Sequence, residues 1–243
     1  MSTLAVESIE GLQTRIRAVP APRPVMPRER VRTLTARQRE LLDELAAMFD
    51  ESGFAELTMA GIAQRLSCSL RTLYELAPSR DELVLTVVDR KLRRIGRTAR
   101  DAISDDMTAL AAAQTYLRAA FVAVVGITEV FARDTALMAP ARRLNESHND
   151  YLVAVTRALL DLAVERREIG PVDTAAVARV LAGTARDLVR PEVMPTLRDT
   201  PAESATAVAD LLLVGLRSTA PRRPSTRPRT RDPSSTGRAS KEL

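Results

Sequence analysis

The feature that most constrains the fold of this chain is a helical spacing of apolar residues from Thr35 to Leu216. Apolar side chains recur three and four positions apart, among good helix formers such as Ala, Leu, Arg and Glu. No segment alternates apolar and polar residues between turn signals, as a half-buried strand would. The spacing therefore predicts an all-α chain.

Several helix starts carry signals of their own. In a capping box, the side chains of the N-cap residue and of the third helical residue each accept a hydrogen bond from the other's backbone N–H group. Three pairs have the capping-box spacing: Thr35 with Gln38, Ser79 with Glu82, and Thr200 with Glu203.

For the C-terminal half we expect helices over about 105–125, 127–138, 140–167, 173–190 and 201–217.

The formal net charge of +5 comes from the two ends of the chain. Residues 1–34 carry six Arg and three Glu, and residues 217–243 carry seven Arg and one Lys against two acidic residues. The body from 35 to 216 has 22 basic and 26 acidic residues, and its part from 35 to 97 has ten of each. The charge therefore does not mark the body as a basic domain.

Both ends are expected to be mobile. Residues 218–242 contain no Leu, Ile, Val, Phe, Tyr or Met, and residues 19–27 are rich in proline. We expect a mobile basic extension over 1–34, with room for one short amphipathic helix before Val19, and a disordered basic tail over 218–243. Such ends add salt-dependent, sequence-independent attraction to DNA where a chain binds DNA.

The residue types exclude several classes of function. A lone Cys68 cannot form an intrachain disulfide, and with His148 as the single histidine no Cys/His zinc site can be assembled. No Gly-rich phosphate loop or HExxH motif is present, and any Ser/His/Asp triad would have to use His148. The N-terminus lacks the features of a signal peptide, and no stretch reaches the roughly 18 to 20 apolar residues of a membrane span. We expect a cytoplasmic protein without catalytic activity, metal or cofactor.

The segment from 35 to 97 divides into four helices with the dimensions of a helix-turn-helix. The first ends at Gly53, and Thr58 is a suitable N-cap for a second, short helix. Ser69 is a suitable N-cap for a third helix over residues 70–76, and small Ala63 allows the two short helices to cross closely. About three residues join these two helices, which is the length of the turn in this motif.

This segment resembles the DNA-binding domain of the TetR family of transcriptional regulators over about 60 residues. The resemblance implies an N-terminal three-helix helix-turn-helix DNA-binding domain over 35–97, joined to a C-terminal helical ligand-binding and dimerisation domain over 98–217. The matching residues are Phe49, Gly53, Phe54, Thr58, Ile62, Ala63, Ser69, Thr72, Leu73, Tyr74 and the run Pro78 to Leu83.

The resemblance places the third helix in the major groove of DNA. Arg71 could then make a bidentate contact with guanine, with a phosphate contact or a solvated position as alternatives. For Tyr74 we expect the ring to pack under the helix while the hydroxyl reaches a phosphate, with core packing as the alternative. Thr58 and Arg80 would clamp the DNA backbone at helix starts, although Thr58 could serve as a cap alone. The DNA-binding residues implied are Thr58, Ser69, Leu70, Arg71, Thr72, Tyr74 and Arg80.

Three positions depart from the family pattern. Arg71 stands in the third helix where the family commonly has a small residue. Ser67 stands in the turn where the family usually has Gly, so it must avoid the left-handed conformation or cost on the order of 1 kcal/mol. Glu75 stands where the family usually has a further aromatic residue, and it places a carboxylate near DNA. Cys68, in the same turn, is expected to be buried filler rather than a redox switch.

For the C-terminal half, the resemblance implies an effector cavity and a dimer interface. The apolar stripe of 140–167 includes His148, which is either a cavity residue or a hydrogen-bonded core histidine. Few aromatic residues favour an apolar or amphipathic effector of unknown identity. The cavity residues expected are Tyr116, Phe121, Phe131, Met138, Asn145 and His148. The dimer residues expected are Val177, Leu181, Leu188, Val208, Leu212 and Leu216, which would equally suit an intramolecular core.

The hypothesis from the sequence is a TetR-like, ligand-responsive repressor. It would bind a palindromic double-stranded DNA operator as a homodimer. The alternative is a helical protein-interaction adaptor that has the same scaffold and has lost specific DNA binding, as Glu75 would permit.

Overall fold

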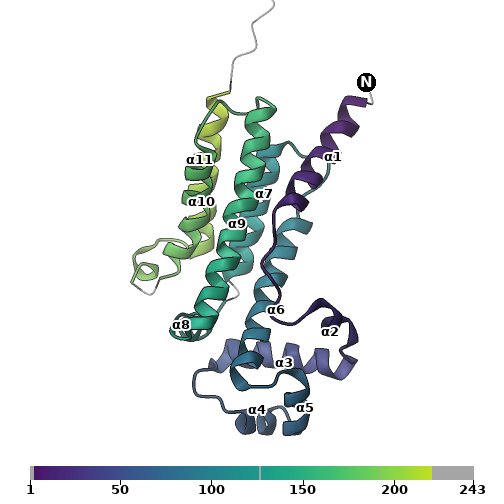
Figure 1. Ribbon diagram of the computed structural model, residues 1–243. Coiled ribbons are helices and arrows are strands. Elements are labelled where there is room, and N and C mark those ends of the chain that lie inside the picture. The colour runs from purple at the N-terminus through teal and green to yellow at the C-terminus, as the bar shows by residue number, and fades with distance from the viewer. Residues whose placement is uncertain (1–2, 126, 191, 221–243) are drawn as a thin grey trace, which may run out of the picture.

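The computed structural model describes residues 3–125, 127–190 and 192–220, and within them it contains helices and no strand. The prediction of an all-α chain is confirmed (Figure 1). The helices are α1 Thr3–Ala18, α2 Arg28–Thr33, α3 Ala36–Ser52, α4 Met59–Arg65, α5 Leu70–Leu76, α6 Arg80–Asp101, α7 Ala109–Val125, α8 Glu129–Leu137, α9 Ala139–Glu165, α10 Thr174–Leu188 and α11 Pro201–Ser218, with a short 3-10 helix at Met194–Thr196.

The predicted caps define several of these helix starts. Thr35 and Thr200 each head a complete capping box, at the first residues of α3 and α11. Ser79 accepts a hydrogen bond from the backbone N–H of Glu82 at the start of α6. These caps act within one helical turn, which explains why the sequence alone identified them.

Two hydrophobic cores divide the described molecule. One, which we call the lower core, lies among α3, α4, α5 and the first half of α6, with Phe49, Ile62 and Leu73 fully buried in it. The other, which we call the bundle core, lies in the bundle of α7, α9, α10 and α11. Helix α6 is long enough to belong to both, and Figure 1 shows it running from the lower group of short helices into the bundle.

Helix α8 forms a second connection between the two cores. Its Phe131 is buried in the lower core, where its ring meets the ring of Phe54 edge-on at 5.7 Å between centroids. The hydroxyl of Thr128, which caps α8, also donates a hydrogen bond to the carbonyl of Asp50 in α3 at 2.7 Å. The bundle therefore contacts the helix-turn-helix through α8 as well as through α6.

The N-terminal segment is ordered, contrary to expectation. Leu12 and Ile16 of α1 are buried in the bundle core, and Met26 and Leu34 are buried in the lower core. Figure 1 shows the chain passing from α1 beside the bundle down to α2 near α3 and α5. The sequence left room for the helix α1, but the expectation of a mobile extension is wrong for residues 11–34, because a few well-spaced apolar side chains suffice to anchor them. The tail predicted over 218–243 lies outside the described residues from 221 onward.

Within the described residues, no single helix has the length and apolar character to cross a membrane. A bent pair, Ala109–Val124 with Glu129–Leu137, meets these criteria only when its two halves are taken together.

Candidate nucleic-acid interface

Helices α4 and α5 start at the predicted caps. The Thr58 hydroxyl accepts a hydrogen bond from the N–H of Gly61 at 3.1 Å, and the Ser69 hydroxyl accepts one from the N–H of Thr72, also at 3.1 Å. The hydroxyls of Ser69 and Thr72 also bond to each other at 2.8 Å. These three residues are therefore fixed at helix starts, and Thr58 and Ser69 remain at the surface.

In the turn between α4 and α5, Ser67 adopts the left-handed conformation, which is the energetically less favourable of the two that the sequence allowed. Ser67 has a φ of 49°, in the left-handed region that glycine occupies without strain. The next N–H group, that of Cys68, bonds to the carbonyl of Ala63 and closes α4. The Cys68 side chain packs against the lower core, and burial raises the pKa of its thiol, which agrees with a filler role.

One face of α5 is anchored in the core and the opposite face points to solvent. Leu73 and Leu76 are buried. Leu70 is exposed, and the Arg71 side chain is 89% exposed. Tyr74 is 52% exposed, so its ring does not pack under the helix as expected. The exposed face of α5 therefore presents an aliphatic, a cationic and an aromatic side chain together.

Arg71 is paired on the surface of α5. Its Nε atom lies 3.2 Å from the carboxylate of Glu75, one turn later on the helix. An exposed ion pair of this kind contributes at most about 1 kcal/mol, because solvent screens both charges. Another hydrogen-bond acceptor or anion can therefore replace Glu75 as the partner of Arg71.

Arg80 makes hydrogen bonds within the chain that the sequence did not indicate. Its guanidinium donates hydrogen bonds to the carbonyls of Leu57 and Ala55, each at 2.7 Å, and to the carbonyl of Phe54. It also pairs with Asp81 at 2.9 Å. These bonds direct the side chain to the loop between α3 and α4. Arg80 therefore positions the loop that leads to Thr58.

Asp134 of α8 binds the other side of the same loop. Its Oδ2 atom accepts hydrogen bonds from the N–H groups of Phe54 and Ala55, at 2.6 and 2.8 Å. Burial raises the pKa of this carboxyl, but the two backbone N–H groups and Arg133 bring it below the ordinary value. Sequence reasoning missed Asp134, because its partners lie 80 residues earlier in the chain.

The six residues expected to line an effector cavity are distributed over different surroundings. Tyr116 and Phe121 are buried in the bundle core, and burial raises the pKa of the Tyr116 phenol. Phe131 is buried in the lower core, and Met138 packs against that core. Asn145 is half-buried on α9. They do not converge on one cavity, because their helical spacing reports burial but does not tell which core each side chain joins.

His148 is a hydrogen-bonded core residue, which is the alternative that its position on an apolar stripe allowed. Its Nε2 atom lies 2.9 Å from Oδ1 of Asp89 on α6. Asp89 also accepts hydrogen bonds from Nε of Arg93 at 2.8 Å and from the N–H of Val25 at 3.0 Å. Burial raises the pKa of Asp89, but these three partners together bring it below its ordinary value.

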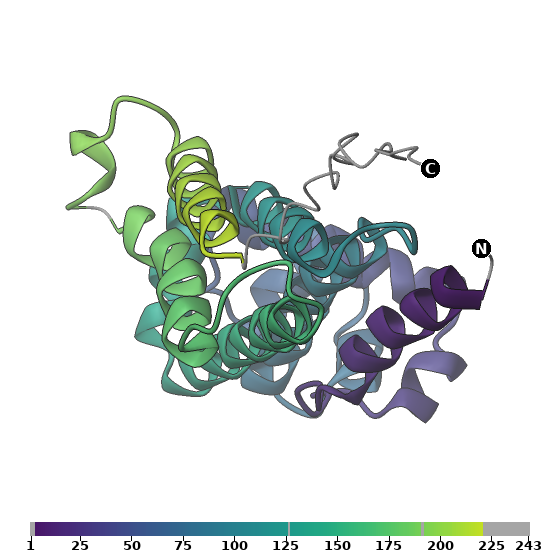
Figure 2. The ribbon, with the colours of Figure 1, turned by 90° about the horizontal axis from the view of Figure 1, so that it is seen from above.

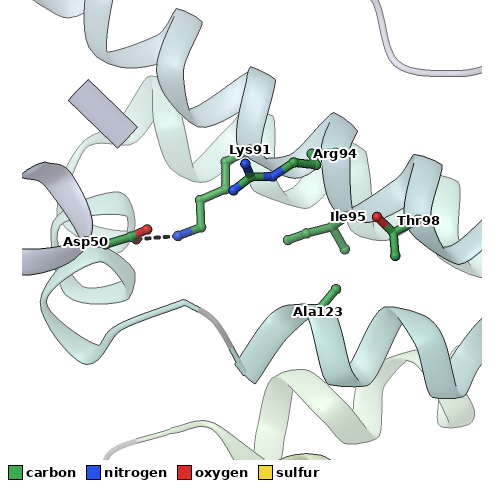
Figure 3. A pocket seen from close by; sticks show the side chains of 6 residues that line it. All are labelled: Asp50, Lys91, Arg94, Ile95, Thr98 and Ala123. Atoms are coloured by element: carbon green, nitrogen blue, oxygen red, sulfur yellow. Dashed lines mark hydrogen bonds and ion pairs between the residues drawn. The ribbon is translucent and has the colours of Figure 1, made fainter. Parts of the chain in front are cut away.

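A small cavity lies where α3, α6 and α7 meet (Figure 3). Its volume is about 180 Å³. Asp50 and Lys91 form an ion pair at one end of it, and the Lys91 ammonium lies 4.6 Å from the centre of the Phe131 ring. Ile95 and Thr98 point from α6 toward Ala123 of α7 (Figure 3). The lining residues are Asp50, Lys91, Arg94, Ile95, Thr98 and Ala123.

The residues expected at a dimer interface divide between the inside and the outside of the bundle. Leu181 is fully buried in the bundle core, and Val177, Leu188 and Leu216 pack against that core, so these four stabilise the single chain. Val208 and Leu212 are exposed. The outward-facing apolar residues of α10 and α11 are Val180, Val208, Leu211, Leu212 and Val214.

Comparison with known proteins gives matches in structure. No protein-family model matches the sequence, and no curated protein matches it. The TetR-family regulator PfmR from Thermus thermophilus has 22% sequence identity and a TM-score of 0.53, over 72% of this chain and 98% of its own. A TetR-like regulator from Rhodococcus sp. RHA1 has 22% identity and a TM-score of 0.55, over 78% of this chain and 99% of its own. SmeT, the repressor of the Stenotrophomonas maltophilia multidrug efflux pump SmeDEF, has 17% identity and a TM-score of 0.60, over 75% of this chain and 90% of its own.

Each of these neighbours is matched over nearly its whole length. The identities are too low to carry individual residue roles across. The chain thus has the fold of the TetR-family transcriptional regulators.

Proposed function

We propose that this chain is a TetR-like transcriptional repressor that binds a palindromic DNA operator as a homodimer and releases it when a small molecule binds. The observation that carries the proposal is the presentation of α5. Leu73 and Leu76 fix the helix in the core, while Leu70, Arg71 and Tyr74 face outward. A short helix held in this way fits the major groove, which is wide enough to admit one α-helix.

The exposed face of α10 and α11 supports the homodimer. Val180, Val208, Leu211 and Leu212 form an outward apolar surface on these two helices. Seen from above, α10 and α11 lie on the side of the molecule opposite the N-terminal segment (Figure 2), and these four side chains are exposed in the single chain. A two-fold axis through the face would present two α5 helices to successive major grooves of a palindrome.

Repression and ligand response are supported by the fold neighbours and by the cavity. The neighbour SmeT is a repressor of a multidrug efflux pump. In this chain, the cavity between α3, α6 and α7 lies at the joint between the helix-turn-helix and the bundle. Its lining mixes charged and apolar side chains, which favours a small amphipathic ligand. A molecule bound there would alter the angle between α3 and α6, and with it the separation of the two α5 helices.

The adaptor remains a second candidate because of Glu75. This carboxylate lies on the exposed face of α5 and pairs with Arg71, so it opposes the approach of phosphates and occupies the residue best suited to base contact. An adaptor would keep the dimer and the fold but would show no sequence preference in DNA binding.

Selection of bound sequences from a random DNA pool, followed by gel-shift titration, separates the two candidates. We expect a palindromic sequence to be enriched and to bind far more tightly than random DNA. Arg71→Ala should relax the preference at one base pair per half-site, costing roughly 5- to 150-fold in discrimination there. An intact dimer that enriches no sequence would favour the adaptor and contradict the regulator.

A further inference from the structure

The helix-turn-helix domain has no net positive charge, although the affinity of proteins for DNA depends largely on cationic side chains. Residues 35–97 hold ten basic and ten acidic residues. On α5 itself, Arg71 and Glu75 form an ion pair. Because neutralisation of phosphates by Lys and Arg supplies much of the affinity for DNA, a neutral domain needs positive charge from another part of the molecule.

The N-terminal segment is fixed against the helix-turn-helix at two points that flank α2. Before α2, the N–H of Val25 bonds to Asp89, and the Arg93 guanidinium donates to the carbonyl of Pro22 at 2.9 Å. Met26 and Leu34, on either side of α2, are both buried in the lower core. Helix α2 is therefore held at both of its ends, while none of its own six residues is buried.

A direct contact places α2 beside α5, the helix proposed to enter the major groove. The Arg30 guanidinium donates a hydrogen bond to the backbone carbonyl of Glu75, in the last turn of α5. Carbonyls at a helix C-terminus have no partner within the helix and carry partial negative charge, which suits a cation. Figure 1 shows α2 at the same end of the molecule as α3 and α5. One arginine side chain therefore spans the gap between α2 and α5.

The remaining arginines of α2 are available to a partner. Arg28 and Arg32 are exposed, and no ion pair with a described carboxylate occupies either one. Helix α2 contains three arginines and one glutamate, so it adds positive charge next to a domain that is neutral. A helix lying in a major groove about 12 Å wide has a phosphate strand along each edge of the groove. Arg28 and Arg32 lie one turn apart on α2, on the side of that helix away from Arg30. Because α2 is fixed beside the end of α5, these two cations lie at the border of the groove that α5 would occupy.

We infer that α2 is a second DNA-contacting element, in which Arg28 and Arg32 bind the phosphates that border the groove occupied by α5. This inference rests on the proposed function, because it presupposes that α5 enters DNA. The contacts carry no sequence information, since phosphates are the same at every base pair. Helix α2 thus supplies affinity, while α5 supplies sequence preference.

The test is a salt titration of DNA affinity with Arg28→Ala, Arg32→Ala and the matched control Arg17→Ala, an exposed arginine of the same N-terminal segment on α1. Fluorescence anisotropy with the selected operator and with random DNA measures each protein between about 50 and 300 mM salt. Loss of one phosphate contact in each subunit should lower the slope of log K against log salt by about 1.8 for the dimer, and weaken binding about 60-fold at about 0.1 M salt. The loss should be equal for operator and random DNA, and Arg17→Ala should match the wild type.

Unchanged slopes for both α2 variants, or an equal change in Arg17→Ala, would overturn the inference. A loss confined to the operator would also overturn it, because it would mean base contact. These outcomes are distinct from failure of the proposed function, in which the wild type itself shows no preferred DNA sequence. All three substituted side chains are exposed, so thermal unfolding should coincide with that of the wild type and exclude misfolding as the cause.

Discussion

At the scale of single residues, Asp134 links the bundle to the helix-turn-helix through two backbone N–H groups. Asp134 is only 2% exposed, and its partners Phe54 and Ala55 belong to the loop that precedes α4. From the opposite side, Arg80 binds three carbonyls of this loop. The loop backbone is thus satisfied by one anion and one cation, and the position of Thr58 depends on both.

Replacing Asp134 by Asn should destabilise the protein by about 1–3 kcal/mol at pH 7, because the charged acceptor of two backbone N–H groups, one buried and one part-buried, is lost. The pKa of Asp134 is lowered in the folded state, so its stabilisation is fully present above the unfolded pKa of about 3.9 and is lost as pH falls through the folded pKa. Urea unfolding of both proteins should therefore show a difference at pH 7 that shrinks below about pH 4. The exposed Asp105→Asn serves as control and should unfold like the wild type at both pH values.

Residue roles were predictable where the partner lies within one helical turn. The caps at Thr35, Thr58 and Ser69 follow from the hydroxyl type and from a partner three positions later, and the structure confirms them. The partners of Asp134 and Arg80 are backbone groups in a distant loop, so no local pattern indicates them. The sequence placed Arg80 at a helix start correctly but could not tell that loop carbonyls take up its hydrogen bonds.

At the scale of elements, α10 and α11 illustrate the limit of periodicity. Both helices have apolar residues on more than one side, so a stripe can be drawn that mixes inward and outward positions. Leu181 faces the bundle core, whereas its neighbour Val180 faces outward. The N-terminal segment shows the opposite error, because Leu12, Ile16 and Met26 are too sparse to predict a fold and yet each is buried. Spacing reveals that a residue can be buried but not what covers it.

The outward face of α10 and α11 gives a sharp prediction for the dimer. Leu211→Glu places a charge on this face, and since Leu211 is 74% exposed the single chain should fold normally. Burying an unpaired carboxylate in an interface is strongly unfavourable, so sedimentation velocity should detect monomers. Leu137→Glu is the matched control, because Leu137 on α8 is 73% exposed but lies on another face. A dimer that survives Leu211→Glu, or one that Leu137→Glu also dissociates, would place the interface elsewhere.

At the scale of the whole molecule, three connections join the helix-turn-helix to the bundle. Helix α6 runs through both, α8 binds α3 and the loop before α4, and the N-terminal segment spans from α9 to α5. The segment is tied to α9 by the pair of Arg15 with Glu165 at 2.5 Å and to α6 by Asp89, which also binds His148 of α9. A change in the bundle that moves α9 against α6 therefore reaches α5 by more than one route.

The cavity between α3, α6 and α7 lies inside this set of connections, and filling it tests its role as the effector site. Ala123→Leu adds three carbons on the side of the cavity that faces Ile95 and Thr98, so it should narrow the cavity, while Ala123→Ser keeps it open. In a thermal-shift screen of small amphipathic compounds, a ligand of this cavity at about 100 times its Kd should stabilise the wild type and the Ser variant by about 2.7 kcal/mol, and leave the Leu variant unchanged. The same compound should weaken operator binding by the first two proteins only, because it binds next to the Asp50–Lys91 ion pair that joins α3 to α6. A compound that stabilises all three proteins equally binds elsewhere, for example in the bundle core beside Tyr116 and Phe121, and would refute this placement.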